Sequence, residues 1–204
     1  MRTFTTQRSL LFTLALLGAA AVGVSPAGAQ TYGWSRYGVG YTGSAPNMLG
    51  GVSAYVLFPS MRGFGIYVDT KWDIDSPAKD PYFLTNMTRQ QVEDQVTGAL
   101  YQQKRESWRG FFNVAIVKPV TPGLMLYAGG GYSRREWFYS YQDPSEQLGQ
   151  LGLFWVQAPE LTGNDVNVMV GAFLRMGRYI AFQTGFETRP GGFTLGATIK
   201  FPPH

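Results

Sequence analysis

The chain has 204 residues, of which 15% are aromatic and 15% charged, and its formal net charge is +4 at neutral pH. This length fits one domain, and the scattered Lys and Arg residues form no basic face for nucleic acid. The absence of cysteine excludes a disulfide framework, a Cys-based metal site and an acylated N-terminal Cys. With 26 glycines, many aromatics and few charges, the composition favours a β-rich protein that faces lipid.

Residues 1–29 are predicted to be a cleaved secretory signal peptide. Arg2 and Arg8 precede and flank the apolar run LLFTLALLGAAAVGV, and Ala27-Gly28-Ala29 supplies the small residues of a cleavage site. A transmembrane anchor, the alternative, needs about 20 apolar residues and is not followed by a cleavage site. The mature domain is then 30–204, with a net charge of about +2 because two basic residues are removed. An exported chain without disulfides or lipid anchor fits a Gram-negative envelope.

Eight segments of the mature chain have strand patterns, and most have the ten or so residues that a tilted membrane-crossing strand needs. The predicted strands are 37–44, 48–58, 62–73, 108–118, 123–139, 165–176, 178–189 and 191–201. In the last of them the apolar residues occupy every second position: Phe193, Leu195, Ala197, Ile199 and Phe201. Alternation alone leaves open whether the apolar face forms a soluble core or faces lipid around a polar lumen.

The connections alternate in length along the chain. Tight turns are predicted at 59–61, 119–122 and 177, whereas the long connections 74–107 and 140–164 fall on the opposite end of an up-and-down meander. Short turns at one end and longer loops at the other are typical of outer-membrane barrels. A lipocalin-like soluble barrel also has eight strands and remains an alternative.

Aromatic residues are concentrated near the predicted strand ends. Such rings are typical of interfacial girdles, where they lie between lipid headgroups and acyl chains. The predicted girdle consists of Trp34, Trp72, Trp108 and Trp137 at the long-loop ends, and Phe58, Phe64, Tyr179 and Phe201 at the tight-turn ends. The alternative is that aromatics are simply good strand formers.

On these features the mature chain resembles the small outer-membrane β-barrels of the OmpA/OmpX type. Its closing strand, Phe193 to Phe201, is similar to the C-terminal assembly signal of that class, although Pro202-Pro203-His204 follows the terminal aromatic. The resemblance implies an all-β, eight-stranded antiparallel up-and-down transmembrane barrel. It also implies that the apolar residues of the closing strand face lipid, whereas Thr194, Thr198 and Lys200 face the lumen.

Applied to the other strands, this orientation points a set of polar side chains inward. The predicted lumen network consists of Asp69, Lys71, Arg109, Asn113, Asn167, Gln183, Glu187 and Arg189. If Trp72 lies near Trp108, Lys71 opposes Arg109. An eight-stranded barrel is just wide enough for its side chains to fill it. We therefore expect these charges to pair and plug the lumen, with an ion path as the alternative. The orientation of strand 123–139 stays open.

The first long connection contains a helix signal. Thr88 and Gln91 have the spacing of a capping box, and Val92, Val96 and Leu100 recur at helical spacing. The sequence predicts a short amphipathic helix extending to about Gln103, across or beside the barrel mouth. Its apolar face either packs on the rim as a lid or offers a binding surface.

Catalysis is not expected. The barrel enzymes to which such proteins are compared depend on a histidine, and the sole histidine here is His204, beyond the last strand. No cofactor or metal site is predicted, and Asp73 and Asp75 are interpreted as part of a solvated loop rather than an acid/base pair.

The predicted function is a non-enzymatic outer-membrane barrel with a structural or surface-interaction role. Its expected partners are outer-membrane lipid and lipopolysaccharide, the barrel-assembly machinery through the C-terminal strand, and a surface ligand at 74–107 and 140–164. The alternatives are an OmpW-like transport barrel for an apolar or small solute, a lipid-modifying barrel enzyme, and a soluble periplasmic ligand-binding barrel.

Overall fold

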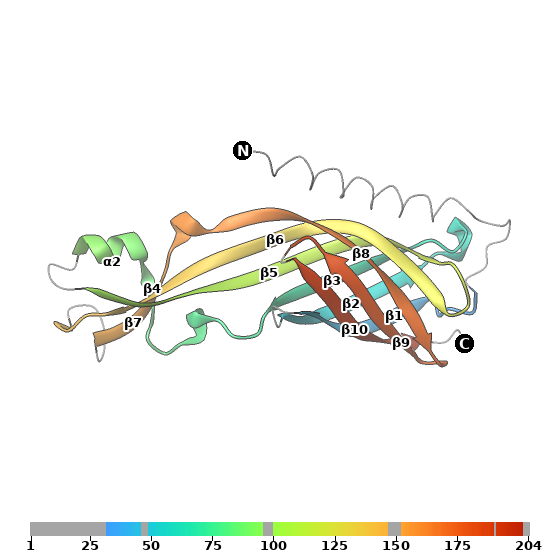
Figure 1. Ribbon diagram of the computed structural model, residues 1–204, viewed down its shortest axis with the longest axis horizontal. Helices are drawn as coiled ribbons and strands as arrows, with labels where there is room; N and C mark the ends of the chain where they lie inside the picture. Colours follow the sequence, from blue (N-terminus) through green and yellow to red (C-terminus); the bar gives the residue numbers. More distant parts are fainter. Residues whose placement is uncertain (1–31, 46–48, 96–99, 147–151, 190, 202–204) are drawn as a thin grey trace.

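The computed structural model describes residues 32–45, 49–95, 100–146, 152–189 and 191–201. Figure 1 shows a barrel at one end and a narrower extension at the other. The predicted signal peptide and the tail 202–204 lie outside the described residues. Among the described residues no helix is both long and apolar enough to cross a membrane.

Eight antiparallel strands of the described chain close into a ring. They are β1 (Tyr37–Ala45), β2 (Leu49–Leu57), β3 (Gly65–Asp73), β5 (Tyr101–Pro119), β6 (Leu124–Gln142), β8 (Gly163–Met176), β9 (Ile180–Glu187) and β10 (Gly192–Phe201). Neighbours in this series pair with each other, and β1 pairs with β10 from Tyr37–Phe201 to Ala45–Phe193. The predicted fold class, an eight-stranded antiparallel up-and-down barrel, is confirmed.

One end of the barrel is formed by tight turns. The 3-10 turn η1 (Pro59–Met61) joins β2 to β3, and Arg62 after it takes a left-handed φ of 55°. Between β8 and β9 the reversal uses Gly177 at φ 89°, a conformation that glycine adopts without steric cost. The chain enters β1 at this same end, because the amide of Leu57 donates to the carbonyl of Arg36.

The wall of the barrel is apolar outside and polar or tightly packed inside. On β10 the outward side chains Phe193 and Ile199 are 65% and 57% exposed, whereas Thr194, Thr198 and Lys200 are buried. On β6, whose parity the sequence left open, Met125 and Tyr127 point inward and are buried. An apolar outer surface around an interior with polar side chains is the arrangement that lipid selects.

The two long connections are not open loops, and this is the largest departure from the predicted strand boundaries. Strands β5 and β6 each have 19 residues and continue past the barrel, where they pair from Tyr101–Gln142 to Ser107–Trp137. The strands β4 (Phe83–Thr88) and β7 (Leu153–Gln157) extend this ribbon, in the order β4–β7–β6–β5. We call this four-stranded part the tip sheet; it lies at the left in Figure 1.

A helix, α2 (Arg89–Gln95), begins where the sequence predicted. The capping box is present: the amide of Thr88 donates to Gln91 Oε1 at 2.8 Å, and the amide of Gln91 donates to Thr88 Oγ1 at 3.4 Å. The predicted extension to Gln103 is wrong, because residues 101–103 belong to β5. The predicted position is also wrong, since α2 lies at the far end of the tip sheet and not at the barrel mouth (Figure 1).

Two separate hydrophobic clusters stabilise the two parts. One fills the barrel interior near the tight turns and includes Tyr67, Met125 and Phe173. The other lies in the tip, where Val92 of α2 contacts a cluster that includes Tyr139, Tyr141 and Phe154. Because the tip has its own core, it is a folded unit built on the barrel strands rather than a pair of loops.

Candidate functional site

The interior of the barrel contains a buried ion triad. Lys71 Nζ lies 2.5 Å from Asp69 Oδ2 and also contacts Glu187 Oε1, and all three side chains are at most 1% exposed. The triad ties β3 to β9 across the lumen. Buried ionisable groups of this kind depend strongly on their partners.

Amides continue the network to the other wall. Asn113 Nδ2 donates to Asp69 Oδ1 at 2.7 Å, and Asn167 Nδ2 donates to Asn113 Oδ1 at 2.8 Å. The backbone amide of Arg189 then donates to Asn167 Oδ1 at 2.9 Å. The chain of hydrogen bonds therefore crosses β3, β5, β8 and the end of β9.

A second branch joins the polar half to the aromatic half. Gln183 Nε2 donates to the hydroxyls of Tyr67 at 2.5 Å and Tyr127 at 3.3 Å, and Tyr67 donates to Asp69 Oδ2 at 3.0 Å. The Tyr67 and Tyr127 rings pack against each other and against Phe173. Tyr127 was not among the predicted lumen residues, because strand 123–139 has no clear polar face.

Trp34 was assigned to the aromatic girdle at the long-loop ends, and this assignment is wrong. Its side chain is only 3% exposed and belongs to the hydrophobic cluster inside the barrel. The indole Nε1 donates to the carbonyl of Thr121, in the tight turn between β5 and β6, at 3.2 Å. Since a chain with an even number of strands starts and ends at the same side, Trp34 lies at the tight-turn end, inside the barrel.

Two predicted lumen arginines lie at the barrel rim. In the observed register Lys71 faces Phe111, two residues from the predicted partner. Arg109 instead pairs with Asp73, with Nη2 to Oδ1 at 2.9 Å and Nε to Oδ2 at 3.0 Å. Arg189 is exposed and forms a distant ion pair with Asp165, at 3.9 Å. Both therefore mark the rim rather than the lumen.

The other girdle residues occupy several environments. Tyr179, Phe201 and Trp72 are 53%, 49% and 39% exposed on the outer wall. The Trp108 indole donates to the carbonyl of Asp73 at 3.1 Å, at the rim. At the other end, the cation of Lys118 lies 4.2 Å from the ring centre of Phe64, and Phe58 is half-buried.

Trp137 is the second girdle residue whose position differs from the prediction. It lies on β6 beyond the last pairing with β8, which ends at Arg135–Gly163. Its ring packs on the hydrophobic cluster of the tip, and the guanidinium of Arg105 stacks over it at 3.9 Å. The residue therefore belongs to the tip sheet, because β6 does not end at the membrane surface.

Arginines gather where the tip sheet leaves the barrel. A small cavity of about 70 Å³ there is lined by side chains that include Arg109, Arg134, Arg135 and Arg189. Asp165 and the Asp73 pair offset part of this charge. The rim is consequently rich in planar cations, which suit phosphate and carboxylate ligands.

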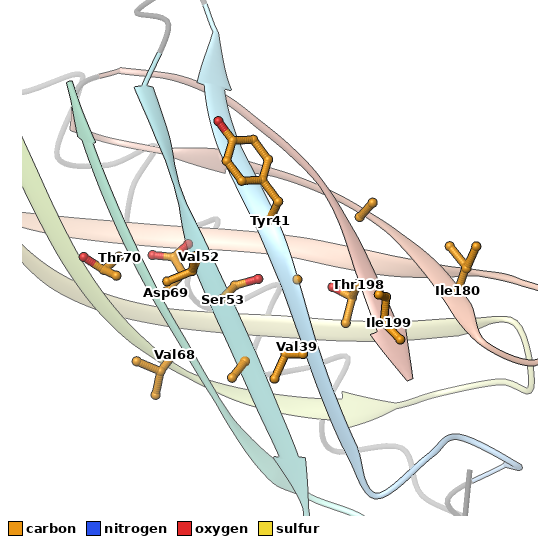
Figure 2. Close-up of a pocket in the computed structure, with 13 residues that line it drawn as sticks. Val39, Tyr41, Val52, Ser53, Val68, Asp69, Thr70, Ile180, Thr198 and Ile199 are labelled. Atoms are coloured by element: carbon orange, nitrogen blue, oxygen red, sulfur yellow. The ribbon is translucent and has the colours of Figure 1, made fainter. Parts of the chain in front are cut away.

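The outer wall also has an apolar hollow of about 720 Å³ on β1, β2, β3, β9 and β10 (Figure 2). Val39 lies near its centre, opposite Ala54 on one side and Ile199 on the other. Tyr41 stands at its edge and is 58% exposed. Because the short side chains of Ala54 and Ala197 lie among longer ones, the surface is depressed here. The hollow belongs to the apolar belt of the wall.

In the tip, α2 is held by a charged cluster on its exposed side. The Tyr141 hydroxyl donates to Glu93 Oε1 at 2.6 Å, and Arg89 Nε donates to the same oxygen at 2.9 Å. The hydrogen bond from Tyr141, together with that from Arg89, lowers the pKa of Glu93. Burial, and next the hydrogen bond to Glu93, raises the pKa of Tyr141 to about 12.

The opposite face of the tip sheet forms one wall of a groove of about 860 Å³. The floor carries Gln103, Ser140 and Gln142, and the second wall is the 3-10 turn η2 (Pro77–Lys79) with its flanking residues. Gln103 Nε2 donates to Gln142 Oε1 at 3.0 Å. The groove is unlike the outer hollow, since most of its lining residues have side chains that can form hydrogen bonds.

No protein-family model matches this chain, and no curated protein matches it. Among solved structures, the attachment invasion locus protein Ail of Yersinia pestis, in complex with the heparin analogue sucrose octasulfate, is 10% identical with a TM-score of 0.48. That comparison covers 82% of this chain and 97% of Ail. A second Ail structure gives 10% identity and a TM-score of 0.47 over 83% and 99%. The barrel assignment rests on the strand register of the present chain.

Proposed function

We propose that this chain is a non-enzymatic integral outer-membrane protein, in which the barrel anchors a tip sheet for interactions at the cell surface. The observation that carries the proposal is the continuity of β5 and β6, which run unbroken from the barrel wall into the tip. A short loop would be enough to connect the strands, whereas the tip has its own core and a helix. Its surfaces are therefore proposed as the sites where partners bind.

The outer membrane is the location that the wall favours. Each of its eight strands exposes large apolar side chains, and a soluble lipocalin-like barrel would place such residues inside. On this proposal residues 1–29 direct export and are removed, leaving the domain 30–204. The closing strand β10, which ends at Phe201, is proposed as the contact for the barrel-assembly machinery.

Lipopolysaccharide is the proposed partner at the rim. Arg134 is half exposed and Arg189 is 57% exposed, and both lie beside the apolar wall, where phosphate groups of the outer leaflet are expected. The exposed rings Trp72, Tyr179 and Phe201 are proposed as interfacial residues at the two ends of the wall.

A closed lumen is the proposed state of the barrel. The ion triad and the amide chain fill the half near the tip, and Trp34 with the aromatic cluster fills the other half. An OmpW-like transport barrel, the alternative, needs a lateral gap in its wall, whereas β6 and β8 pair without a break over twelve positions. The proposal therefore predicts no channel activity.

One edge of the tip sheet is available to an extended partner. Above Gly110, β5 pairs with β6 alone among the described strands, because β3 ends at Asp73. An unpaired strand edge presents a row of backbone donors and acceptors, which a partner strand can satisfy. This edge is proposed as the main protein-binding surface of the tip.

Three measurements test the proposal. Outer membranes are fractionated and run on gels with and without boiling in SDS, and a faster unboiled band is expected from a closed barrel. Planar bilayers containing the protein are expected to show no conductance steps.

Cells that express the wild type are compared with cells that express a variant with an unfolded tip, Val92→Asp, for attachment to wells coated with mucin, collagen or fixed sister cells. Equal attachment by the two strains, at equal surface amounts, contradicts the surface-interaction role.

A further inference from the structure

The groove on the tip sheet has the size of a ligand site and is not explained by the barrel. Its volume of about 860 Å³ lies within the range of roughly 300–1,000 Å³ that is usual for small-molecule sites. Strands β5, β6 and β7 supply its floor, and the segment Asp75–Asp80 supplies the opposite wall. Because these elements belong to the tip, the groove is separate from both the lumen and the apolar hollow of the barrel wall.

The polar lining offers both donors and acceptors. Gln103 and Gln142 use one hydrogen bond between themselves, which leaves further amide donor and acceptor positions directed to solvent. Asp75, Lys104 and Glu106 are exposed side chains that line the same groove. A ligand that matches this lining carries many groups that both donate and accept, as sugar hydroxyls do.

The charge of the groove argues against a polyanion. Three carboxylates, Asp75, Asp80 and Glu106, face two lysines, Lys79 and Lys104, so the groove carries an excess of one negative charge. A phosphate or sulfate polymer would meet repulsion here, whereas the arginine rim, on another part of the molecule, suits such groups.

An apolar patch completes the groove. Leu153 of β7 is 41% exposed, and the edge of Trp155, otherwise buried, lines the cavity beside it. Ligand sites combine such apolar surface with a few placed polar groups, and a pyranose ring offers a C–H face together with its hydroxyls. An extended peptide would instead use the strand edge of β5, which is unpaired.

We infer that the groove lined by Gln103, Gln142 and Glu106 binds an uncharged oligosaccharide, which makes the tip a glycan-recognition module. This deepens the proposed surface-interaction function and depends on it. The sugar can come from the neutral hexoses of the cell's own lipopolysaccharide or from the glycans of another cell.

The test uses the full chain in phosphatidylcholine nanodiscs that are free of lipopolysaccharide. The probes are neutral tri- to pentasaccharides of hexoses and N-acetylhexosamines, sulfated oligosaccharides, and core oligosaccharide released from the expressing strain. Wild type is expected to bind neutral members of the panel. The double variant Gln103→Ala/Gln142→Ala is expected to bind them about tenfold more weakly or worse, as the loss of two hydrogen bonds implies.

Gln102→Ala is the matched control, because Gln102 lies opposite Tyr141 in the register, on the face that carries α2. It is expected to bind as the wild type does, and all variants should keep the gel shift of a folded barrel. Strongest binding to core oligosaccharide assigns the cell's own surface as the source, and strongest binding to other sugars assigns a foreign glycan. Binding to sulfated probes alone, equal binding by the double variant, or no neutral ligand overturns the inference. The attachment experiment can still succeed in that case, because it does not require a sugar.

Discussion

Lys71 is the residue on which the interior of the barrel most depends. Its ammonium separates two buried carboxylates, Asp69 and Glu187, which belong to different strands. Removal of the cation leaves like charges facing each other in a site from which water is largely excluded, and that is costlier than the loss of an exposed ion pair.

We expect Lys71→Met to destabilise the barrel by about 3–5 kcal/mol, the range for breaking a buried ion pair. Arg189→Met, which removes an exposed cation from a pair at 3.9 Å, is the matched control and should cost less than about 1 kcal/mol. The measurement is the urea midpoint of unfolding in micelles, followed by the gel mobility of unboiled samples. Equal midpoints for the two variants would show that the triad contributes little.

Glu93 gives the tip a dependence on pH. Its pKa is lowered in the folded tip by the hydrogen bonds from Tyr141 and Arg89, so the ionised form is the one that holds α2. The stabilisation is fully present above the ordinary glutamate pKa of about 4.3 and is lost as the pH falls through the lowered folded value.

Hydrogen exchange in residues 89–95 is therefore expected to be slow and constant from pH 7 to about pH 5, once corrected for intrinsic rates, and to rise below about pH 4. Tyr141→Phe removes the largest cause of the lowered pKa. In this variant protection should be lower at neutral pH, by about one hydrogen bond's contribution of 1 kcal/mol, and depend less on acid. An unchanged acid profile in Tyr141→Phe would exclude the Glu93 contact as the cause.

Among the elements, α2 and the distal parts of β5 and β6 form a unit that can unfold while the barrel stays folded. Val92 is fully buried against the tip cluster, which among the described residues is separate from the cluster inside the barrel. Stability in such proteins differs between parts, and the part with fewer buried contacts opens first.

Val92→Asp places an unpaired carboxylate in the tip core and is expected to release α2. Limited trypsin digestion should then cut at Arg89, whereas the heat-dependent gel shift of the barrel should stay as in the wild type. Gln90→Asp, at an exposed position of the same helix, serves as the control and should resist cleavage. Loss of the gel shift in Val92→Asp would mean that tip and barrel fold as one cooperative unit.

The sequence predicted the barrel strands better than the tip, for a physical reason. In Phe193 to Phe201 lipid and lumen impose opposite polarities on alternate residues, so the strand is visible in its pattern. The segment QQKRES at 102–107 is polar on both faces, and only its pairing with β6 makes it a strand. Residues 140–164 were predicted to be a loop. The apolar run Phe154-Trp155-Val156 within that segment was the available signal for β7.

The interior site was partly predictable. The alternation places Asp69, Asn113, Asn167, Gln183 and Glu187 inside, and these are the residues that the structure buries. The partner of Arg109 was wrongly predicted because the register between neighbouring strands is not specified by any local pattern. A shift of two residues between β3 and β5 changes its partner from Lys71 to Asp73. Trp34 was misplaced because a tryptophan suits an interface and an interior plug equally.

For the molecule as a whole, the direction of insertion is the main consequence of the proposal. Both long connections lie at one end, and if that end faces outward the tight turns face the periplasm. The chain contains no cysteine, so a single introduced thiol reports its own location.

Asp94→Cys, exposed on α2, is expected to react with a membrane-impermeant maleimide in intact cells. Met61→Cys, in the exposed turn η1 at the opposite end, should react only after the cells are opened. Labelling is read by fluorescence of the unboiled band, which restricts the signal to folded barrels. The reverse pattern would show that the tip faces the periplasm and would exclude a role at the cell surface.

The continuity of β5 and β6 also determines how the molecule responds to force. The seven residues of β5 beyond the barrel, 101–107, span on the order of 20 Å at about 3.3 Å each. Tension applied to the tip away from the cell acts along these two strands. It loads in shear the hydrogen-bond ladders that join β5 to β3 and β6 to β8, so many bonds bear the load at once. A partner held by the tip therefore pulls on the barrel wall itself, and no separate linker lies between the two parts.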